Sequence, residues 1–134
     1  MTSLGLVVAQ FNSTVTTEMQ AAAEAAAAER DAEITATVEV PGAYDAPLAA
    51  DRLARREEID AVAVIGAIIT GDTNHDQVIA DAAAQGLTDV SLDRDTPVTF
   101  GVSGPGMSGA EARERETKGA EAVNAAVDLV GVGK

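Results

Sequence analysis

Hydrophobic and polar residues follow two patterns along the chain, one typical of strands and one typical of helices, and the two patterns alternate. Short runs rich in valine and isoleucine, which favour β-strands, fall at residues 4–9, 34–40, 61–69 and 97–102. Longer stretches in which alanine, leucine and valine recur among charged residues favour helices, at 14–30, 47–57, 75–90 and 108–130. The pattern therefore predicts four strands, each followed by a helix.

The third predicted strand, Ala61–Ile69, is apolar along its whole length, which is typical of a parallel strand covered by helices on both faces. Strands that alternate with helices are joined by right-handed crossovers, so a parallel sheet follows. We expect an α/β fold: a three-layer α/β/α sandwich whose four-stranded parallel sheet has the flavodoxin-like order 2-1-3-4. No repeat or linker divides residues 1–134, which we expect to form a single domain.

Composition narrows the classes of function. The chain has 22 acidic residues against 9 Lys and Arg, a net charge of −13, no cysteine and a single histidine, His75. The absence of thiols excludes disulfides and cysteine-based metal sites, and one histidine excludes a multi-histidine cluster, so we expect no metal. The negative charge opposes binding to nucleic acid or to an anionic membrane surface.

The chain carries no sign of targeting. Its first residues contain no basic segment, and its longest apolar run, 61–69, is far shorter than the ~20 residues of a membrane span. We therefore expect a cytoplasmic protein. The acid excess, with only two lysines, suits a halophilic source, although an ordinary acidic protein has the same composition. The small alanines of its helices bury little area each, which suggests that association between subunits adds stability.

Candidate site residues gather at the strand-to-helix turns. Ligands of open parallel sheets bind at the carboxyl ends of the strands. All three aromatic residues and the histidine lie in or beside the turns: Phe11, Tyr44, Phe100 and His75. This arrangement favours a site for a flat ligand held between aromatic rings, although aromatic residues that cap one end of the core would give the same pattern.

The turn before the third predicted helix offers acid–base and anion-binding groups. Thr73 and Asp76 have the spacing of a capping box, which puts His75 in the first helical turn. The helix dipole there favours the neutral imidazole, which can accept a proton; a solvated histidine at a helix start would look the same. The main-chain amides of Gly71, Asp72 and Thr73 would form a cradle for a phosphate.

Three other features have two interpretations each. Asp45 either caps the helix that starts near Pro47 or accepts hydrogen bonds from ligand hydroxyls. The turn at 103–107 overlaps a G-x-G-x-x-G pattern at 104–109. No strand follows the last predicted helix, so a tight turn is favoured over a dinucleotide site. Arg115 extends the apolar stripe of the last helix, where it would pair with an anionic ligand or with an acid at an interface.

Taken in order, the turns resemble those of 6,7-dimethyl-8-ribityllumazine synthase. The matching motifs are Phe11-Asn12 and residues 40–47, 66–75 and 97–101, and the turn at 103–107 is similar to the archaeal branch of the family. The resemblance covers nearly the whole chain. It implies a transferase of riboflavin biosynthesis, which condenses 5-amino-6-(D-ribitylamino)uracil with 3,4-dihydroxy-2-butanone 4-phosphate and uses no cofactor.

The resemblance also implies a role for each matching residue. Phe11 would stack on the pyrimidine ring, Tyr44 and Asp45 would hold the ribityl chain, and His75 would shuttle protons. The substrate-binding residues implied in this way are Phe11, Ala43, Tyr44, Asp45, Ala67, Ile68, Ile69 and Phe100. The phosphate-binding residues are Gly71, Asp72, Thr73 and Arg115. Phe100 and Arg115 would come from the adjacent subunit of a homopentamer.

The chain departs from the family pattern in two places. Ala120 stands where a lysine usually follows the phosphate arginine, and the nearest lysine is Lys118. Tyr44 and Asp45 replace the more usual Phe-Glu pair, so a shorter carboxylate has to reach the ribityl hydroxyls. The alternatives are an archaeal-type riboflavin synthase paralogue, a non-catalytic flavin- or lumazine-binding protein, and a purely structural shell protein. The form of the 66–75 loop favours the lumazine synthase.

Overall fold

The computed structural model describes residues 1–69, 75–107 and 117–134 of the chain. Its strands and helices follow in the order β1 (Thr2–Ala9), α1 (Ser13–Glu29), β2 (Ala32–Val40), the 3-10 helix η1 (Ala43–Asp45), α2 (Ala46–Ala54), β3 (Ala61–Ile69), α3 (His75–Arg94), β4 (Val98–Met107) and α5 (Lys118–Leu129). The four strands are parallel and lie in the order β2-β1-β3-β4, which confirms the predicted sheet.

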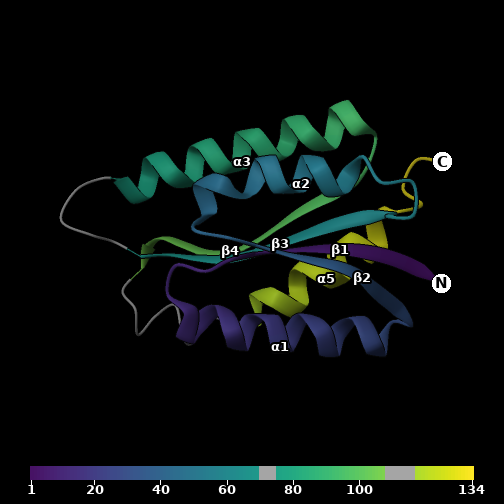
Figure 1. The fold of residues 1–134 in the computed structure, drawn as a ribbon, viewed down its shortest axis with the longest axis horizontal. Coiled ribbons are helices and arrows are strands. Elements are labelled where there is room, and N and C mark those ends of the chain that lie inside the picture. The colour runs from purple at the N-terminus through teal and green to yellow at the C-terminus, as the bar shows by residue number, and fades with distance from the viewer. Residues whose placement is uncertain (70–74, 108–116) are drawn as a thin grey trace.

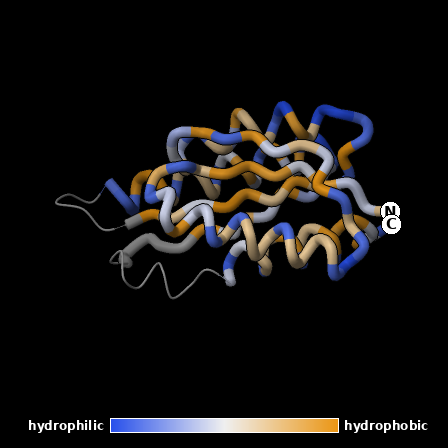
Figure 2. Tube along the Cα trace, turned by 60° about the horizontal axis from the view of Figure 1, so that its bottom comes forward, coloured by the Kyte–Doolittle hydropathy of each residue, from blue (hydrophilic) through white to orange (hydrophobic). Residues whose placement is uncertain are grey.

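Helices cover both faces of this sheet. In Figure 1, α2 and α3 lie on one side of the strands, and α1 and α5 lie on the other, which confirms the predicted three-layer sandwich. β3 supplies side chains to both layers: Val62 and Val64 pack under α2 and α3, while Ala61 and Ala63 face α1 and α5. Figure 2 shows the strands as the most hydrophobic part of the chain. The uniformly apolar sequence of β3 follows from this double burial.

The layer of α1 and α5 is packed tightly because its contact residues are small. Gly119 lies so close to α1 that a Cβ on it would come within 2.0 Å of the carbonyl oxygen of Met19. Ala122, Val123 and Ala126 are buried on the same stripe of α5, as the sequence predicts. Only a glycine at position 119 allows this approach between the helices.

Strand β4 is longer than predicted. The sequence predicts a turn at 103–107, but β4 continues through these residues to Met107, so that prediction is wrong. The irregularity lies in the pairing: Ala67 pairs with Ser103, whereas Ile69 pairs with Met107. β4 is an edge strand, where a proline and a bulged segment cost no hydrogen bonds to a second neighbour.

The helix ends also differ from the prediction. α2 ends at Ala54 instead of residue 57, and α3 continues to Arg94 instead of residue 90. After α2 the chain turns so that Ile59 enters the core, which a longer helix would prevent. The predicted start of the last helix at 108 lies outside the described residues, in which α5 begins at Lys118. None of the described helices combines the length and the apolar character that a membrane span needs.

Candidate active site

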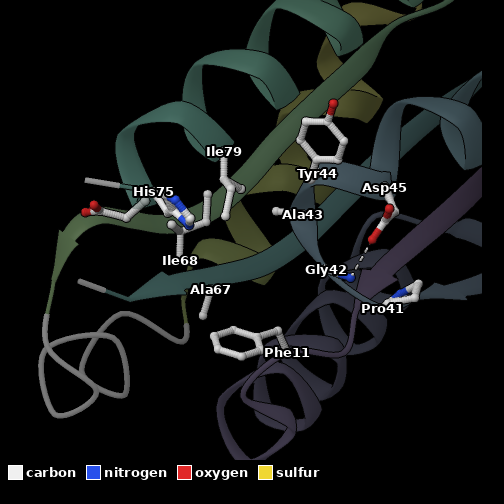
Figure 3. A pocket seen from close by; sticks show the side chains of 11 residues that line it. Phe11, Pro41, Gly42, Ala43, Tyr44, Asp45, Ala67, Ile68, His75 and Ile79 are labelled. Atoms are coloured by element: carbon white, nitrogen blue, oxygen red, sulfur yellow. Dashed lines mark hydrogen bonds between the residues drawn. The ribbon is translucent and has the colours of Figure 1, made fainter. Parts of the chain in front are cut away.

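A cavity of about 510 Å³ opens at the carboxyl ends of β1, β2 and β3, beside the start of α3 (Figure 3). Its volume falls in the usual range for small-molecule sites. The residues that line it are Phe11, Pro41, Gly42, Ala43, Tyr44, Asp45, Ala67, Ile68, His75, Asp76 and Ile79. Three separate turns of the chain therefore meet around one hollow, at the sheet edge where the sequence predicts a ligand.

Main-chain hydrogen bonds hold the first two of these turns together. The amide of Gln10 donates to the carbonyl of Val40 at 2.8 Å, and the amide of Phe11 donates to the carbonyl of Pro41 at 3.0 Å. The next residue, Asn12, takes a left-handed conformation (φ 63°), so α1 can begin at once. These contacts place the Phe11 ring on one wall of the cavity, below Ala67 in Figure 3.

The second turn is fixed by a carboxylate. Oδ2 of Asp45 accepts a hydrogen bond from the amide of Gly42 at 3.1 Å, while the Asp45 amide donates to the Gly42 carbonyl at 3.0 Å. Asp45 occupies the N-cap position of α2, but its side chain makes no capping hydrogen bond to that helix, so a side-chain cap is not formed. No other hydrogen bond of this carboxylate occurs among the described residues, and Asp45 lines the cavity.

The aromatic residues of the first two turns are open to solvent. Phe11 and Tyr44 are each 62% exposed, although both line the cavity. Exposed apolar side chains grouped around one hollow mark a binding surface, whereas apolar side chains scattered singly over a surface do not. Their exposure is therefore consistent with rings that a ligand or another subunit covers.

The floor and the far wall come from β3 and α3. Ala67 and Ile68 are buried at the end of β3, and His75 faces the cavity from the first described residue of α3 (Figure 3). Ile79 lies one helical turn after His75 on the same face. Asp76, next to the histidine, is only 6% exposed.

The structure thus brings seven of the predicted site residues around one cavity: Phe11, Ala43, Tyr44, Asp45, Ala67, Ile68 and His75. Phe100 does not line this cavity; it lies on β4 at the opposite edge of the sheet from β2 and is 38% exposed. Ile69 is the last residue of β3. Gly71, Asp72, Thr73 and Arg115 lie outside the described residues, and with Thr73 so does the first residue of the predicted capping box.

Four lining residues were missed by the sequence analysis: Pro41, Gly42, Asp76 and Ile79. Ile79 could have been found from helix periodicity, because residues four apart share a face and His75 was already a candidate. Within the described ranges, no three His, Asp or Glu side chains gather as a metal site would require.

The sequence as a whole matches the family model of 6,7-dimethyl-8-ribityllumazine synthase over residues 2–134. The chain belongs to this family. The lumazine synthase of Halobacterium salinarum is 75% identical over 129 residues, which cover 96% of this chain and 97% of that protein. That of Halorubrum lacusprofundi is 72% identical over 129 residues, with 96% of each chain covered. The lumazine synthase of Methanobrevibacter smithii is 44% identical over 127 residues, or 95% of this chain and 92% of the relative.

These matches confirm the resemblance that the turns suggested. The relatives at 72% and 75% identity come from halophiles, which fits the acid excess of this chain. The alternatives of a riboflavin synthase paralogue or a non-catalytic binding protein are not favoured, because the relatives named above are lumazine synthases over nearly their full lengths.

Proposed function

We propose that this chain catalyses the lumazine synthase reaction, the condensation of 5-amino-6-(D-ribitylamino)uracil with 3,4-dihydroxy-2-butanone 4-phosphate to 6,7-dimethyl-8-ribityllumazine, in riboflavin biosynthesis. The observation that carries the proposal is the cavity around which three of the matching turns meet, with Phe11, Asp45 and His75 in its walls. Membership of the family supports the same reaction.

The pyrimidine ring is expected between Phe11 and the end of β3. β3 pairs with β1 only as far as Ile65, whereas its pairing with β4 continues to Ile69. The main-chain groups of residues 66–69 that point towards β1 therefore have no strand partner on that side. Amide and carbonyl groups at the end of a strand suit the polar edge of a pyrimidine, and the Phe11 ring supplies a face for stacking.

The ribityl chain is expected to run along the second turn. Oδ2 of Asp45 is already held by the Gly42 amide, so the carboxylate has a fixed orientation and offers Oδ1 to a hydroxyl donor. Ala43 is small and buried and leaves room beside this carboxylate, while Tyr44 adds a ring and a hydroxyl at the rim.

His75 is the candidate for proton transfer. It lines the cavity from α3 with the apolar side chains of Ile68 and Ile79 beside it (Figure 3). Imine formation, phosphate elimination and ring closure all move protons, which one imidazole can accept and return. Most of the rate gain would come from holding the two substrates together, because ordering removes a large entropic cost.

Binding the phosphate and covering the open side of the cavity require residues other than those that line it. We assign the phosphate to Gly71, Asp72, Thr73 and Arg115 by the family pattern. Phe100 is on the edge strand β4 while the cavity is formed by β1, β2 and β3, so a neighbouring copy could bring its Phe100 to the open side. Such head-to-tail contacts close into rings, and a homopentamer working in the cytoplasm is the proposed assembly.

A direct assay tests the proposed reaction. The purified protein is incubated with both substrates at low and at high KCl, and formation of the fluorescent lumazine is followed above the uncatalysed background. Saturable production in either salt is the expected result. A folded protein that yields no lumazine at either KCl concentration would contradict the proposal. Riboflavin formed from lumazine alone would point to the riboflavin synthase paralogue.

A further inference from the structure

The segment around Phe100 is anchored to α5 by a buried hydroxyl. Thr99, the residue before Phe100, is 7% exposed, and its Oγ1 donates a 2.8 Å hydrogen bond to the carbonyl oxygen of Ala122 in α5. That carbonyl lies inside the helix and is not a terminal group awaiting a cap. The hydroxyl therefore fixes the position of β4 along α5 and contributes nothing to helix capping.

The residue after Phe100 makes a second close contact with the same helix. A Cβ on Gly101 would lie 2.5 Å from the Cβ of Ala122 and 2.6 Å from the carbonyl oxygen of Lys118. The main chain of β4 thus lies directly against α5 on both sides of Phe100. Because α5 is in turn pressed on α1 at Gly119, this part of β4 has a rigid support behind it.

Phe100 itself points away from that support. Successive side chains of a strand alternate between faces, so Phe100 lies on the face opposite Thr99 and Gly101. It remains 38% exposed on an edge strand that pairs with β3 alone. Pairing with β3 and contact with α5 together hold the main chain under this ring, and the Thr99 hydroxyl makes the specific polar contact with α5.

We propose that Thr99 is a positioning residue for the condensation. Its hydrogen bond to Ala122 locks β4 on α5 and so holds Phe100 where it completes the cavity of the neighbouring copy. This inference rests on the proposed function, and specifically on Phe100 acting in a site formed with another subunit. Thr99 itself touches no substrate.

A pair of substitutions separates the hydroxyl from the shape of the side chain. Thr99→Val keeps the branched shape and removes the donor, whereas Thr99→Ser keeps the donor. We expect Thr99→Val to raise the KM for ribitylaminouracil about three- to tenfold with little change in the KM for the butanone phosphate, the size of effect that one lost hydrogen bond gives. Thr99→Ser should restore the KM. Equal effects of Val and Ser, or no effect of Val, would overturn the proposal.

In the proposed site, one subunit supplies the cavity and its neighbour donates Phe100; mixed assemblies test whether Thr99 acts through the subunit that donates Phe100. His75→Ala damages the cavity, and Phe100→Ala removes the donated ring. Co-expressed 1:1 with two affinity tags, these two variants should regain activity at about a quarter of the sites, because random neighbours pair an intact cavity with an intact ring that often. Failure of this pair would overturn the shared site and the role of Thr99 together, while lumazine formation by the unaltered protein would still stand.

The decisive mixture contains Thr99→Val. Combined with His75→Ala, it should show a population of sites with the unaltered KM, because the His75→Ala chain donates an intact Phe100 segment. Combined with Phe100→Ala, it should show none, because both chains carry lesions on the donated side. If the His75→Ala and Phe100→Ala pair regains activity but the unaltered KM never reappears with Thr99→Val, Thr99 does not position the donated ring.

Discussion

Asn12 illustrates how one backbone position shapes the site. It lies in the left-handed region (φ 63°) between Phe11 in the cavity wall and the first turn of α1. Asparagine and glycine adopt this conformation at lower cost than other residues. Its Nδ2 is buried and has no hydrogen-bond partner among the described residues. The backbone conformation of Asn12 is therefore the feature that we connect with the turn.

Substitutions at position 12 should therefore separate by backbone preference. We expect Asn12→Ala to lower the free energy of unfolding by about 1 kcal/mol, because alanine is strained at positive φ. Asn12→Gly should cost less, since glycine accepts the conformation freely. Chemical denaturation at high KCl measures both, and an alanine variant as stable as the glycine variant would contradict this explanation.

His75 should matter for turnover more than for binding. We expect His75→Ala to slow turnover by about a hundredfold, a typical loss when an acid–base group is removed, while binding of ribitylaminouracil stays nearly intact. Val78→Ala is the matched control, because Val78 is an exposed residue of the same helix turn that does not line the cavity. Steady-state rates and calorimetric titration distinguish the two effects. Unchanged turnover would remove His75 from the mechanism.

At the scale of elements, packing decided what the sequence pattern left open. The strands could be predicted because valine- and isoleucine-rich runs alternate with helical stretches, and their parallel pairing follows from right-handed crossovers. The uniformly apolar β3 also had to lie inside the sheet. The length of β4 and the ends of α2 and α3 could not, since they depend on residues distant in sequence. Asp45 is the same case within the site: spacing allowed a helix cap or a ligand contact, and the structure shows a third contact, the hydrogen bond from the Gly42 amide that fixes the turn.

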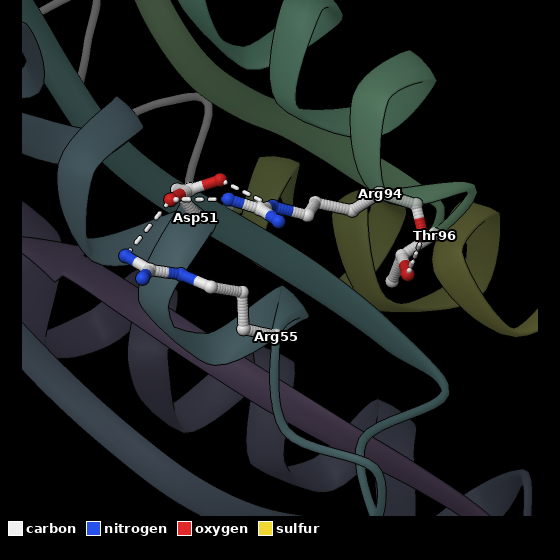
Figure 4. Close-up of polar contacts among 4 residues, drawn as sticks. All are labelled: Asp51, Arg55, Arg94 and Thr96. Atoms are coloured by element: carbon white, nitrogen blue, oxygen red, sulfur yellow. Dashed lines mark hydrogen bonds and ion pairs between the residues drawn. The ribbon is translucent and has the colours of Figure 1, made fainter.

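The end of α3 is held by an ion-pair cluster. Asp51 of α2 accepts hydrogen bonds from Nε of Arg94 at 2.8 Å and from its second nitrogen at 3.3 Å, and Arg55 lies 3.0 Å away (Figure 4). The hydrogen bond from Arg94 is the main cause that holds the pKa of Asp51 below its ordinary value. This contact ties the last residue of α3 to α2.

The cluster gives stability a pH dependence with a definite sign. A carboxylate whose pKa is lower in the folded state stabilises the fold above its unfolded pKa, near 4, and loses that contribution as the pH falls through the folded value. We expect Asp51→Asn to lower the melting temperature by a few degrees at pH 7, with the difference shrinking below about pH 4. Asp81→Asn, at an exposed position of α3, is the control. A difference that stays constant with pH would contradict the assignment.

Contact between α1 and α5 predicts a sharp contrast between two glycines. Gly119→Ala should destabilise the protein by about 3 kcal/mol, because its Cβ would overlap the carbonyl of Met19. Gly131→Ala should be nearly neutral, since nothing lies within 4 Å of its added Cβ. Thermal unfolding compares the two variants. Equal stabilities would show that the helices are not packed as described.

At the scale of the whole molecule, charge is the dominant feature. A net charge of −13 on 134 residues repels itself within each subunit and between subunits. In 0.1 M salt such repulsion decays over a distance of about 10 Å, and this distance shortens as the salt concentration rises. The composition predicted this property, whereas the proposed assembly depends on surfaces contributed by more than one chain.

Stability and assembly should therefore both increase with salt. We expect the melting temperature and the share of assembled protein to rise together between 0.1 and about 2 M KCl, because screening removes repulsion within and between subunits. Calorimetry and sedimentation at matched salt follow the two quantities. A melting temperature that is independent of KCl would mean that the acidic surface has no bearing on stability.

The central claim is that the cavity at the ends of β1, β2 and β3 is where lumazine is made. The most direct measurement is a crystal structure of the protein with 6,7-dimethyl-8-ribityllumazine bound. The account predicts the ring system against Phe11, the ribityl chain beside Asp45 and a Phe100 from a neighbouring subunit over the open side. Lumazine bound elsewhere, with this cavity empty at saturating concentration, would contradict it.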